Sequence, residues 1–267
     1  MFRMKLYWTF TKKAFLRSAV YRFDVLSRMG SNLIFLLMWG SIWTALYAGK
    51  ESADGVTFQA MLTYIVVSQF LSGINGAGTP LWDMQEKVRT GDIALELMRP
   101  FDVPLRYLFA DFGSVAFYFM FALLPVYILV FLFIDLTLPM SWETWVLFLI
   151  TAFIGFLIRY CIEMSFSFLS FFLVETGGIV DIFYFAMSLL SGSVIPLWFF
   201  PDWLEKLAIY MPFQGIYYIP TSIFIGKITG VEIAFSIATQ IFWLLVCYGI
   251  LRFVWHKASQ KVVVQGG

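Results

Sequence analysis

Charged side chains are scarce in this 267-residue sequence, in which 13% of the residues are Asp, Glu, Lys or Arg and 61% are hydrophobic. A typical soluble protein has about 25% charged residues, because its surface has to be covered with polar groups. The scarcity of charge therefore excludes a soluble globular domain, and the high apolar content excludes a disordered chain. The composition predicts an all-α integral membrane protein, and the aromatic content of 20% suits interfacial belts.

Histidine and cysteine are almost absent as well. The single histidine, His256, lies near the C-terminus, so neither a Ser-His-Asp triad nor a histidine metal site is expected. Cys161 and Cys247 fall in apolar runs, where a thiol packs as a small side chain. The pairs Gly49-Lys50 and Gly226-Lys227 lack the other residues of a phosphate-binding loop. We expect no cofactor, metal or ATP site in this chain, and the net charge of +1 indicates no nucleic-acid partner.

Long apolar runs are abundant. Crossing a bilayer takes about 20 apolar residues in a helix. Six stretches are predicted to do so: 29–48, 58–79, 112–133, 145–168, 179–199 and 231–253. They would form a transmembrane domain over residues 29–253, followed by a tail at 254–267.

The distribution of Lys and Arg predicts the orientation of these spans. An even number of spans places both termini on one side, together with the loop at residues 82–111, named here the inner loop. Fourteen of the 18 Lys and Arg residues belong to that side, whereas Lys50, Lys206 and Lys227 belong to the other. By the positive-inside rule, both termini and the inner loop are predicted to be cytoplasmic.

Residues 1–28 are predicted to form an interfacial helix, because one helical side lacks charge. That side carries Met4, Tyr7, Trp8, Thr11, Phe15, Ser18 and Ala19, and the basic residues Arg3, Lys5, Lys12, Lys13 and Arg17 are spread around the other. Arg22 interrupts the pattern. The alternative is a basic leader that merely precedes the first span.

The inner loop contains signals for one short helix. Asp92 after Gly91 suits a helix N-cap, and Pro100 restricts Arg99 to extended conformations, so a helix of under two turns is predicted over 93–98.

Such a short helix is poorly stable alone in water. Ile93, Leu97 and Met98 would be its available apolar contacts, so we expect it to need a partner surface. Alternatively, it lies on its own bundle or on the membrane.

The segment at 201–229, on the opposite side, is predicted to be a re-entrant helical hairpin. Gly192 and Pro196 weaken the end of the fifth span, Pro201 suits the start of a new helix, Trp203 belongs to its apolar side, and Pro212 stops it.

Residues 213–225 are apolar but too short to cross the membrane. Phe200 and Phe213 are expected to lie with the prolines in this hairpin and its outer gate. The alternative is an aromatic belt that lies flat on the membrane.

Two charged residues, Arg159 and Glu163, fall four positions apart within the predicted fourth span and hence on one helix face. A charge at the bilayer centre costs about 3 kcal/mol even on lenient insertion scales, so both should face the bundle. Their role is either structural or one in transport or gating.

Two segments resemble type-2 ABC exporter permeases. The sequence from Thr90 to Pro100 is similar to the cytoplasmic loop of these proteins, and the sequences from Ser191 to Leu204, Met211 to Phe213 and Tyr218 to Pro220 are similar to their outer segment. The resemblance is greatest to the bacterial branch associated with drug and viologen export. It implies an N-terminal elbow helix, a coupling helix at Gly91–Pro100 that docks on an ATP-binding subunit, and an outer re-entrant hairpin.

The resemblance also implies an assembly of two permease chains and two ATPase chains, with ATP and Mg on the ATPase. We therefore expect an exporter subunit of the bacterial cytoplasmic membrane that moves an amphipathic or hydrophobic substrate. The candidates for the seam between permeases are small residues: Gly30, Ser31, Gly40, Ser188, Ser191, Gly192 and Ser193. The alternatives are a lipid-acting membrane enzyme, and a passive channel or structural bundle.

Overall fold

The computed structural model describes residues 2–48, 50, 52–75, 80–172 and 177–261, and most of them are helical, as predicted. The helices are α1 (Phe2–Val20), α2 (Arg22–Leu46), α3 (Phe58–Asn75), α4 (Pro80–Thr90), α5 (Ile93–Leu97), α6 (Val103–Tyr118), α7 (Leu124–Phe133), α8 (Trp142–Ser167), α9 (Gly177–Leu190), α10 (Asp202–Ile209), α11 (Tyr218–Phe224) and α12 (Val231–Ser259). A small antiparallel hairpin pairs β1 (Ser52–Ala53) with β2 (Val56–Thr57).

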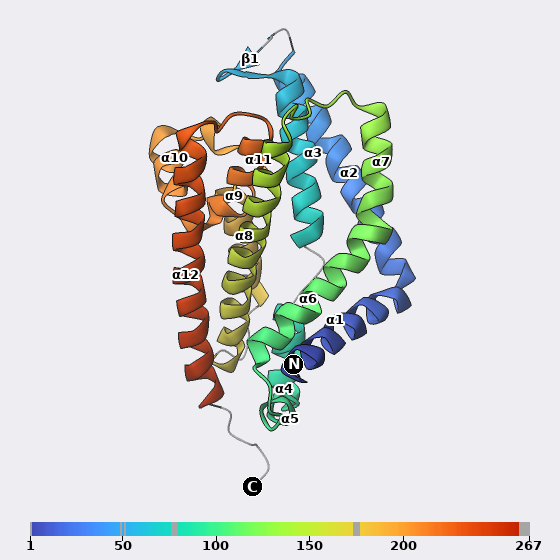
Figure 1. Ribbon diagram of the computed structural model, residues 1–267, viewed down its shortest axis with the longest axis vertical. Coiled ribbons are helices and arrows are strands. Elements are labelled where there is room, and N and C mark those ends of the chain that lie inside the picture. Colours follow the sequence, from blue (N-terminus) through green and yellow to red (C-terminus); the bar gives the residue numbers. More distant parts are fainter. Residues whose placement is uncertain (1, 49, 51, 76–79, 173–176, 262–267) are drawn as a thin grey trace.

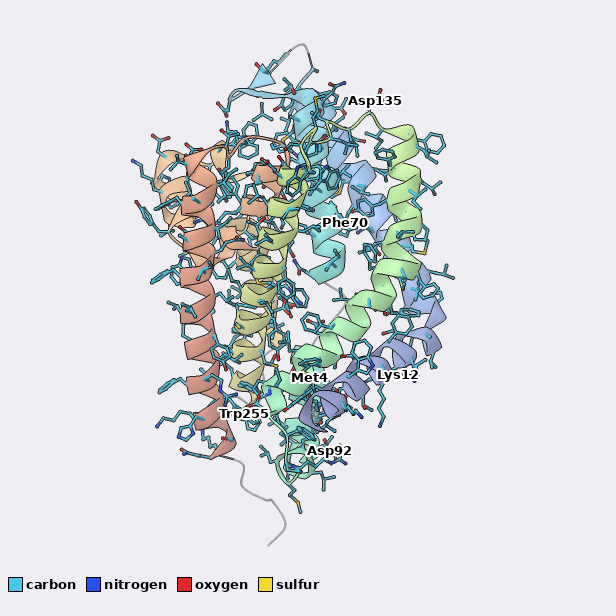
Figure 2. The ribbon with its side chains drawn as sticks, in the orientation of Figure 1. Met4, Lys12, Phe70, Asp92, Asp135 and Trp255 are labelled. Atoms are coloured by element: carbon cyan, nitrogen blue, oxygen red, sulfur yellow. The ribbon has the colours of Figure 1, made fainter. Side chains whose placement is uncertain are left out.

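The helices form an elongated bundle with two distinct ends (Figure 1). One end holds the start of α1, the helices α4 and α5, and the end of α12; the other holds β1 and α10. Figure 2 shows Asp92 and Asp135 at these opposite ends. The basic segments that the sequence assigned to one side therefore lie at one end of the molecule.

Within the part of the chain that the structure describes, four helical stretches are long and apolar enough to cross a membrane: Phe23–Leu46, Val103–Phe133, Trp142–Phe171 and Val231–Ser259. The two other predicted spans correspond to α3 and α9. Helix α3 has 18 residues, and half of them are buried in the bundle, where they do not need to suit lipid. An all-α membrane protein is thus confirmed, whereas the count of six spans stays a prediction.

Helix α9 is shorter than the predicted span at 179–199. It ends at Leu190, after 14 residues, which is about 21 Å at 1.5 Å per residue. Gly192 follows with a φ of +76°, a left-handed conformation that favours glycine. The expectation of a continuous helix to residue 199 is wrong because the chain turns at this glycine.

Helix α6 begins earlier than the predicted span at 112–133. Asp102 caps its start by accepting a hydrogen bond from the Leu105 backbone N–H, and Pro104 lies in the first turn. The predicted inner loop therefore contains α4, α5 and the first part of α6. A π-helical turn, Phe119–Leu123, separates α6 from α7.

Helix α1 packs along α6, and the close approach involves Gly113. A Cβ atom at Gly113 would lie 2.1 Å from the backbone oxygen of Thr11, which also donates from its hydroxyl to the Phe109 carbonyl at 2.8 Å. The residues of the predicted uncharged side of α1 do not all face the bundle, because Tyr7 is buried whereas Trp8 is 66% exposed. Lys12 points away from the bundle (Figure 2).

Helix α8 is the centre of the core. Its residues Ile158 and Met164 are fully buried. A Cβ atom at Gly155 would lie 2.5 Å from the Gly215 backbone oxygen, so the outer segment approaches α8 closely. Gln240 of α12 holds this contact by donating to the Gly215 carbonyl at 2.7 Å and to the Thr151 carbonyl at 3.0 Å.

Candidate functional site

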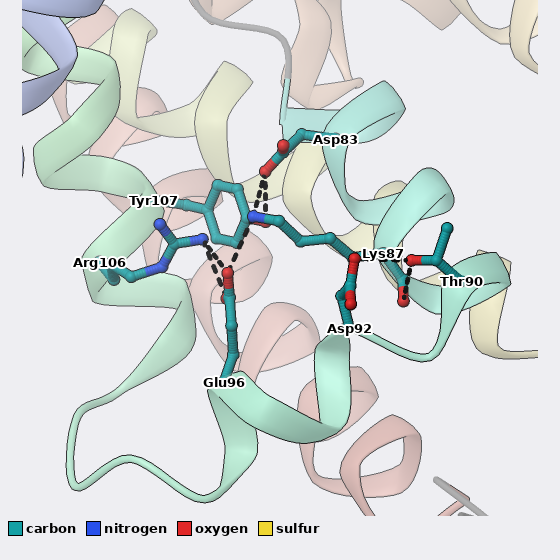
Figure 3. Close-up of polar contacts among 7 residues, drawn as sticks. All are labelled: Asp83, Lys87, Thr90, Asp92, Glu96, Arg106 and Tyr107. Carbon is teal, nitrogen blue, oxygen red and sulfur yellow. Dashed lines mark hydrogen bonds and ion pairs between the residues drawn. The ribbon is translucent and has the colours of Figure 1, made fainter. Parts of the chain in front are cut away.

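A polar cluster joins α4, α5 and α6 at the end that carries α5 (Figure 3). Its centre is Lys87, whose ammonium group donates to the Asp83 carboxylate at 2.6 Å, the Glu96 carboxylate at 2.8 Å and the Tyr107 hydroxyl at 3.0 Å. Arg106 adds two hydrogen bonds to both oxygens of Glu96, each 2.9 Å long. The cluster therefore fastens α5, which is too short to be stable alone, to two longer helices.

The hydroxyl of Tyr107 completes the cluster by donating to Asp83 at 2.7 Å. Burial by itself would raise the pKa of the Asp83 carboxyl. The hydrogen bonds from Lys87 and Tyr107 and the positive charges of Lys87 and Arg106 outweigh burial and lower this pKa below its usual value. Asp83 is therefore ionised at neutral pH and retains its two donors.

The residues that were predicted to flank the short helix do lie at the two ends of α5. Gly91 has a φ of +82°, a conformation that favours glycine. Asp92 occupies the N-cap position, but its side chain caps nothing and accepts instead from the Thr90 hydroxyl at 3.0 Å. The predicted capping bond is therefore wrong. Arg99 and Pro100 are exposed directly beyond the helix.

The apolar side chains of α5 differ from the prediction in one respect. Ile93 is 2% exposed and packs in the core of the bundle, so the expectation that it is free for a partner is wrong. Met98 is 82% exposed, as that role requires, and Leu97 is partly buried. Leu95, which sequence reasoning passed over, is 59% exposed.

Asp102 ties this end of the bundle together. Its backbone N–H donates to the Tyr7 hydroxyl of α1 at 3.1 Å, and its carboxylate forms an ion pair with Arg252 of α12. The helix that follows α5 is thereby connected to both α1 and α12.

A second charged cluster lies deeper in the bundle, along α6 and α8. Arg159 donates to the Glu163 carboxylate on its own helix and to Asp111 of α6, at 2.9 Å. The three side chains are at most 5% exposed. The sequence placed Asp111 at the end of a loop, and so this partner of Arg159 was missed.

A cavity of about 400 Å³ opens beside this second cluster. Arg159 and Glu163 contribute to its wall from α8, Ser72 and Asn75 from α3, and Tyr184 from α9. The wall therefore combines charged, hydroxyl, amide and aromatic groups. No group of three or more His, Cys, Asp and Glu side chains suited to a metal ion occurs within the described residues.

The predicted outer hairpin consists of two unlike parts. Helix α10 begins directly after Pro201, and Pro212 opens a short 3₁₀ turn, Pro212–Gly215, after α10 has ended. Trp203 is 69% exposed on α10. The neighbouring positions differ in burial: Pro196 is buried, and Phe200 and Phe213 are partly buried.

Helix α11 is buried from Ile219 to Phe224. The Phe224 ring lies 4.9 Å from the Phe148 ring and 5.0 Å from the Trp145 ring of α8, measured between centroids. The Tyr64 hydroxyl of α3 donates to the Gly192 carbonyl at 2.7 Å. These contacts fold the segment into the bundle, so the alternative of a belt lying flat on the membrane does not describe α11.

Residues 33–266 match the sequence profile of a family described as ABC-2 family transporter protein. This match covers the whole bundle after the first part of α2. The chain belongs to the ABC-2 transporter family. The comparison with curated proteins finds no match.

Membership identifies this ABC-2 chain as a multi-pass membrane component of an ABC transporter, and it implies an ATP-binding partner subunit. The resemblance seen in the sequence is confirmed at the level of the family, and the drug and viologen branch stays a prediction. This ABC-2 chain contains the two charged clusters described above, each of which joins side chains from different helices. One faces the end that carries α5, and the other faces a cavity inside the bundle.

Proposed function

We propose that this chain is the permease subunit of an ATP-driven exporter in the bacterial cytoplasmic membrane. Both termini and α5 face the cytoplasm, and a separate subunit binds ATP and Mg²⁺. The family supports the role of permease. The gathering of the basic segments and of both terminal helices at one end supports this orientation.

One observation supports the proposed site at which the ATP-binding subunit docks. Leu95 of α5 and Met98, which directly follows α5, expose apolar side chains, and the Lys87 cluster holds this helix against α4 and α6. Exposed apolar groups on a fixed support are what a partner protein can bury with little loss of conformational entropy. Leu95, Met98 and Arg99 are named here the docking surface.

The cavity beside Arg159 and Glu163 is proposed to belong to the translocation path. Its polar and aromatic wall suits an amphipathic substrate, with the outer hairpin at the far end of the path. A single chain encloses only part of such a path, so a second permease chain, identical or related, completes it. Gly30 and Gly40 of α2 support this seam, because a Cβ atom at either would meet nothing within 4 Å.

The docking surface is tested with Met98→Asp in a permease co-expressed with its ATP-binding subunit and purified in mild detergent. Loss of one buried apolar contact weakens binding by about 10- to 100-fold, so the subunit should no longer copurify. Met140→Asp is the matched control, because Met140 is even more exposed than Met98 but lies on the loop between α7 and α8, at the opposite end. Equal recovery of the subunit with both variants would contradict the docking surface.

A further inference from the structure

Helix α6 takes part in both charged clusters. Tyr107 belongs to the cluster beside α5, and Asp111 belongs to the cluster beside the cavity. The two residues are four positions apart, so they lie on one face of α6, about 6 Å apart along its axis. The cluster beside α5 and the cluster beside the cavity are thus separated by a single turn of α6, which contributes one residue to each.

The two carboxylates on Arg159 are not equivalent. Glu163 lies on the same helix as Arg159, so this pair moves as a unit with α8. Asp111 lies on α6, and its contact with Arg159 changes whenever α6 shifts or tilts relative to α8. Whether Arg159 pairs with both helices or with α8 alone therefore depends on its contact with Asp111.

The ion pair between Asp111 of α6 and Arg159 of α8 uses only some of the hydrogen-bonding atoms of the two side chains. Asp111 accepts through Oδ2, while its Oδ1 is buried and has no hydrogen-bond partner among the described residues, and the same holds for Nε of Arg159. Unsatisfied buried polar atoms are unfavourable and favour an alternative arrangement in which they are paired. A small displacement of α6 would allow the guanidinium and the carboxylate to pair differently.

Helix α6 is also separated from α7, the helix that follows it along the chain. The π-helical turn at Phe119–Leu123 interrupts the regular α-helical hydrogen bonding, and Pro125 follows it. Such a turn allows the section from Val103 to Tyr118 to tilt as one piece.

We propose that Asp111 is a positioning residue that transmits the state of the α4–α5 loop to the cavity, by holding or releasing Arg159 as α6 moves. The inference rests on the proposed function, because the movement begins when the ATP-binding subunit acts on the docking surface. Within this scheme, Tyr107 passes the movement from the loop to α6, and Arg159 carries it to the cavity wall.

The test measures how the cavity responds to nucleotide. Ser188 lines the cavity, so Ser188→Cys, in a chain with Cys161→Ala and Cys247→Ala, reports access there. The probe is a trimethylammonium methanethiosulfonate reagent. Its labelling rate is compared in the permease–ATPase complex without nucleotide and with ATP plus vanadate. We expect a ratio of at least tenfold for the parent, and a ratio within twofold of unity for Asp111→Asn, with the ATPase subunit still bound.

Glu163→Gln is the comparison variant, because it removes a carboxylate of similar burial from the same guanidinium. Since Glu163 lines the cavity, its absolute labelling rates are not compared, and only the ratio between the two nucleotide states is used. A merely structural or electrostatic role of the cluster would change both variants alike, whereas the proposal requires Glu163→Gln to keep the parent's ratio. An equal loss in both variants, or the parent's ratio in Asp111→Asn, would overturn it. Asp111→Glu should restore the response.

Tyr107→Phe tests the same link without touching a buried charge, should Asp111→Asn fail to fold. It should reduce the ratio, whereas Tyr118→Phe should not, because the Tyr118 hydroxyl of α6 donates to Asp24 of α2 instead. Equal ratios for these two variants would overturn the inference. A parent permease that binds no ATPase subunit would overturn the proposed function itself, whereas a parent that binds it but shows no nucleotide response would overturn the inference alone.

Discussion

Two cations of this permease, Lys87 and Arg159, each lie between two carboxylates, but they differ in burial. Lys87 and its partners Asp83 and Glu96 have side chains that are 14–34% exposed. The side chains of Arg159 and its partners are at most 5% exposed. The same arrangement of charges therefore exists once near the end of the bundle and once in its interior.

The difference in burial gives the two clusters different properties. A solvent-accessible ion pair contributes about 0–1 kcal/mol and is readily exchanged for water. Removing one partner of a buried pair costs about 3–5 kcal/mol, because a charge is left without compensation. The cluster around Lys87 thus tolerates the loss of a single member at a small cost in stability, whereas the cluster around Arg159 keeps its members and can only redistribute its contacts.

The largest effect is expected for Arg159→Met, which leaves Asp111 and Glu163 without a cation. We expect the free energy of unfolding to fall by about 3–5 kcal/mol, and Lys87→Met to lower it by about 1 kcal/mol or less. Chemical unfolding of the two purified variants in detergent measures both values. Similar losses for the two variants would show that burial does not separate the clusters.

The same experiment is sharpened by a variant in which Arg159→Met is combined with Asp111→Asn and Glu163→Gln. Because no charge is then left in the interior, most of the lost stability should return. A combined variant as unstable as Arg159→Met alone would indicate that lost packing, rather than lost charge compensation, causes the defect.

The next largest effect concerns the support of α6, the helix that the two clusters share. Gly113→Ala should destabilise the protein by about 1–3 kcal/mol, because the added Cβ would lie 2.1 Å from the Thr11 backbone oxygen and separate α1 from α6. Gly249→Ala of α12 is the control, since its Cβ meets nothing within 4 Å. Thermal unfolding distinguishes them, and equal midpoints would contradict the close approach of α1.

Glu96→Gln should have a smaller effect on stability, of about 1 kcal/mol or less, because its partners Lys87 and Arg106 can reach water. It should nevertheless weaken binding of the ATP-binding subunit, because α5 loses its bonds to α4 and α6. Titration of the purified subunit onto the permease measures this loss. Glu232→Gln, at the start of α12, is the control and should bind as the parent does.

The apolar runs predicted the long helices, because length and hydropathy are local properties of the sequence. The end of α9 carried its own signals, Gly192 and Pro196, but the apolar run continued past them and extended the predicted helix. The start of α6 was missed for the opposite reason, since Asp102 and Pro104 are good signals for a helix start inside a polar segment.

The sequence predicted fewer of the contacts within the charged clusters than of the helices. Arg159 and Glu163 are neighbours on one helix, so their spacing predicted the contact. Asp111 is 48 residues away from Arg159, and only the packing of α6 on α8 brings them together. The orientation of α5 was missed because one and a half turns are too short for periodicity to show that Ile93 faces the bundle and Leu95 does not.

The smallest effect expected is the pH dependence of the cluster around Lys87. Its contacts lower the pKa of Asp83 in the folded protein below the ordinary value of 3.8. The resulting contribution to stability is therefore present above pH 3.8 and is lost as the pH falls through the lower pKa of the folded state.

We expect the difference in thermal midpoint between the parent and Asp83→Asn to be constant from neutral pH to about pH 5, and to shrink toward zero on further acidification, because the Asp83 carboxylate is then protonated in both states. Unfolding curves of the two proteins at matched ionic strength measure the difference. A difference that grows as the pH falls would mean that burial outweighs the donors, so that Asp83 has a raised pKa. In that case burial, rather than access to water, would dominate around Lys87 as well, and the distinction between the two clusters would not hold.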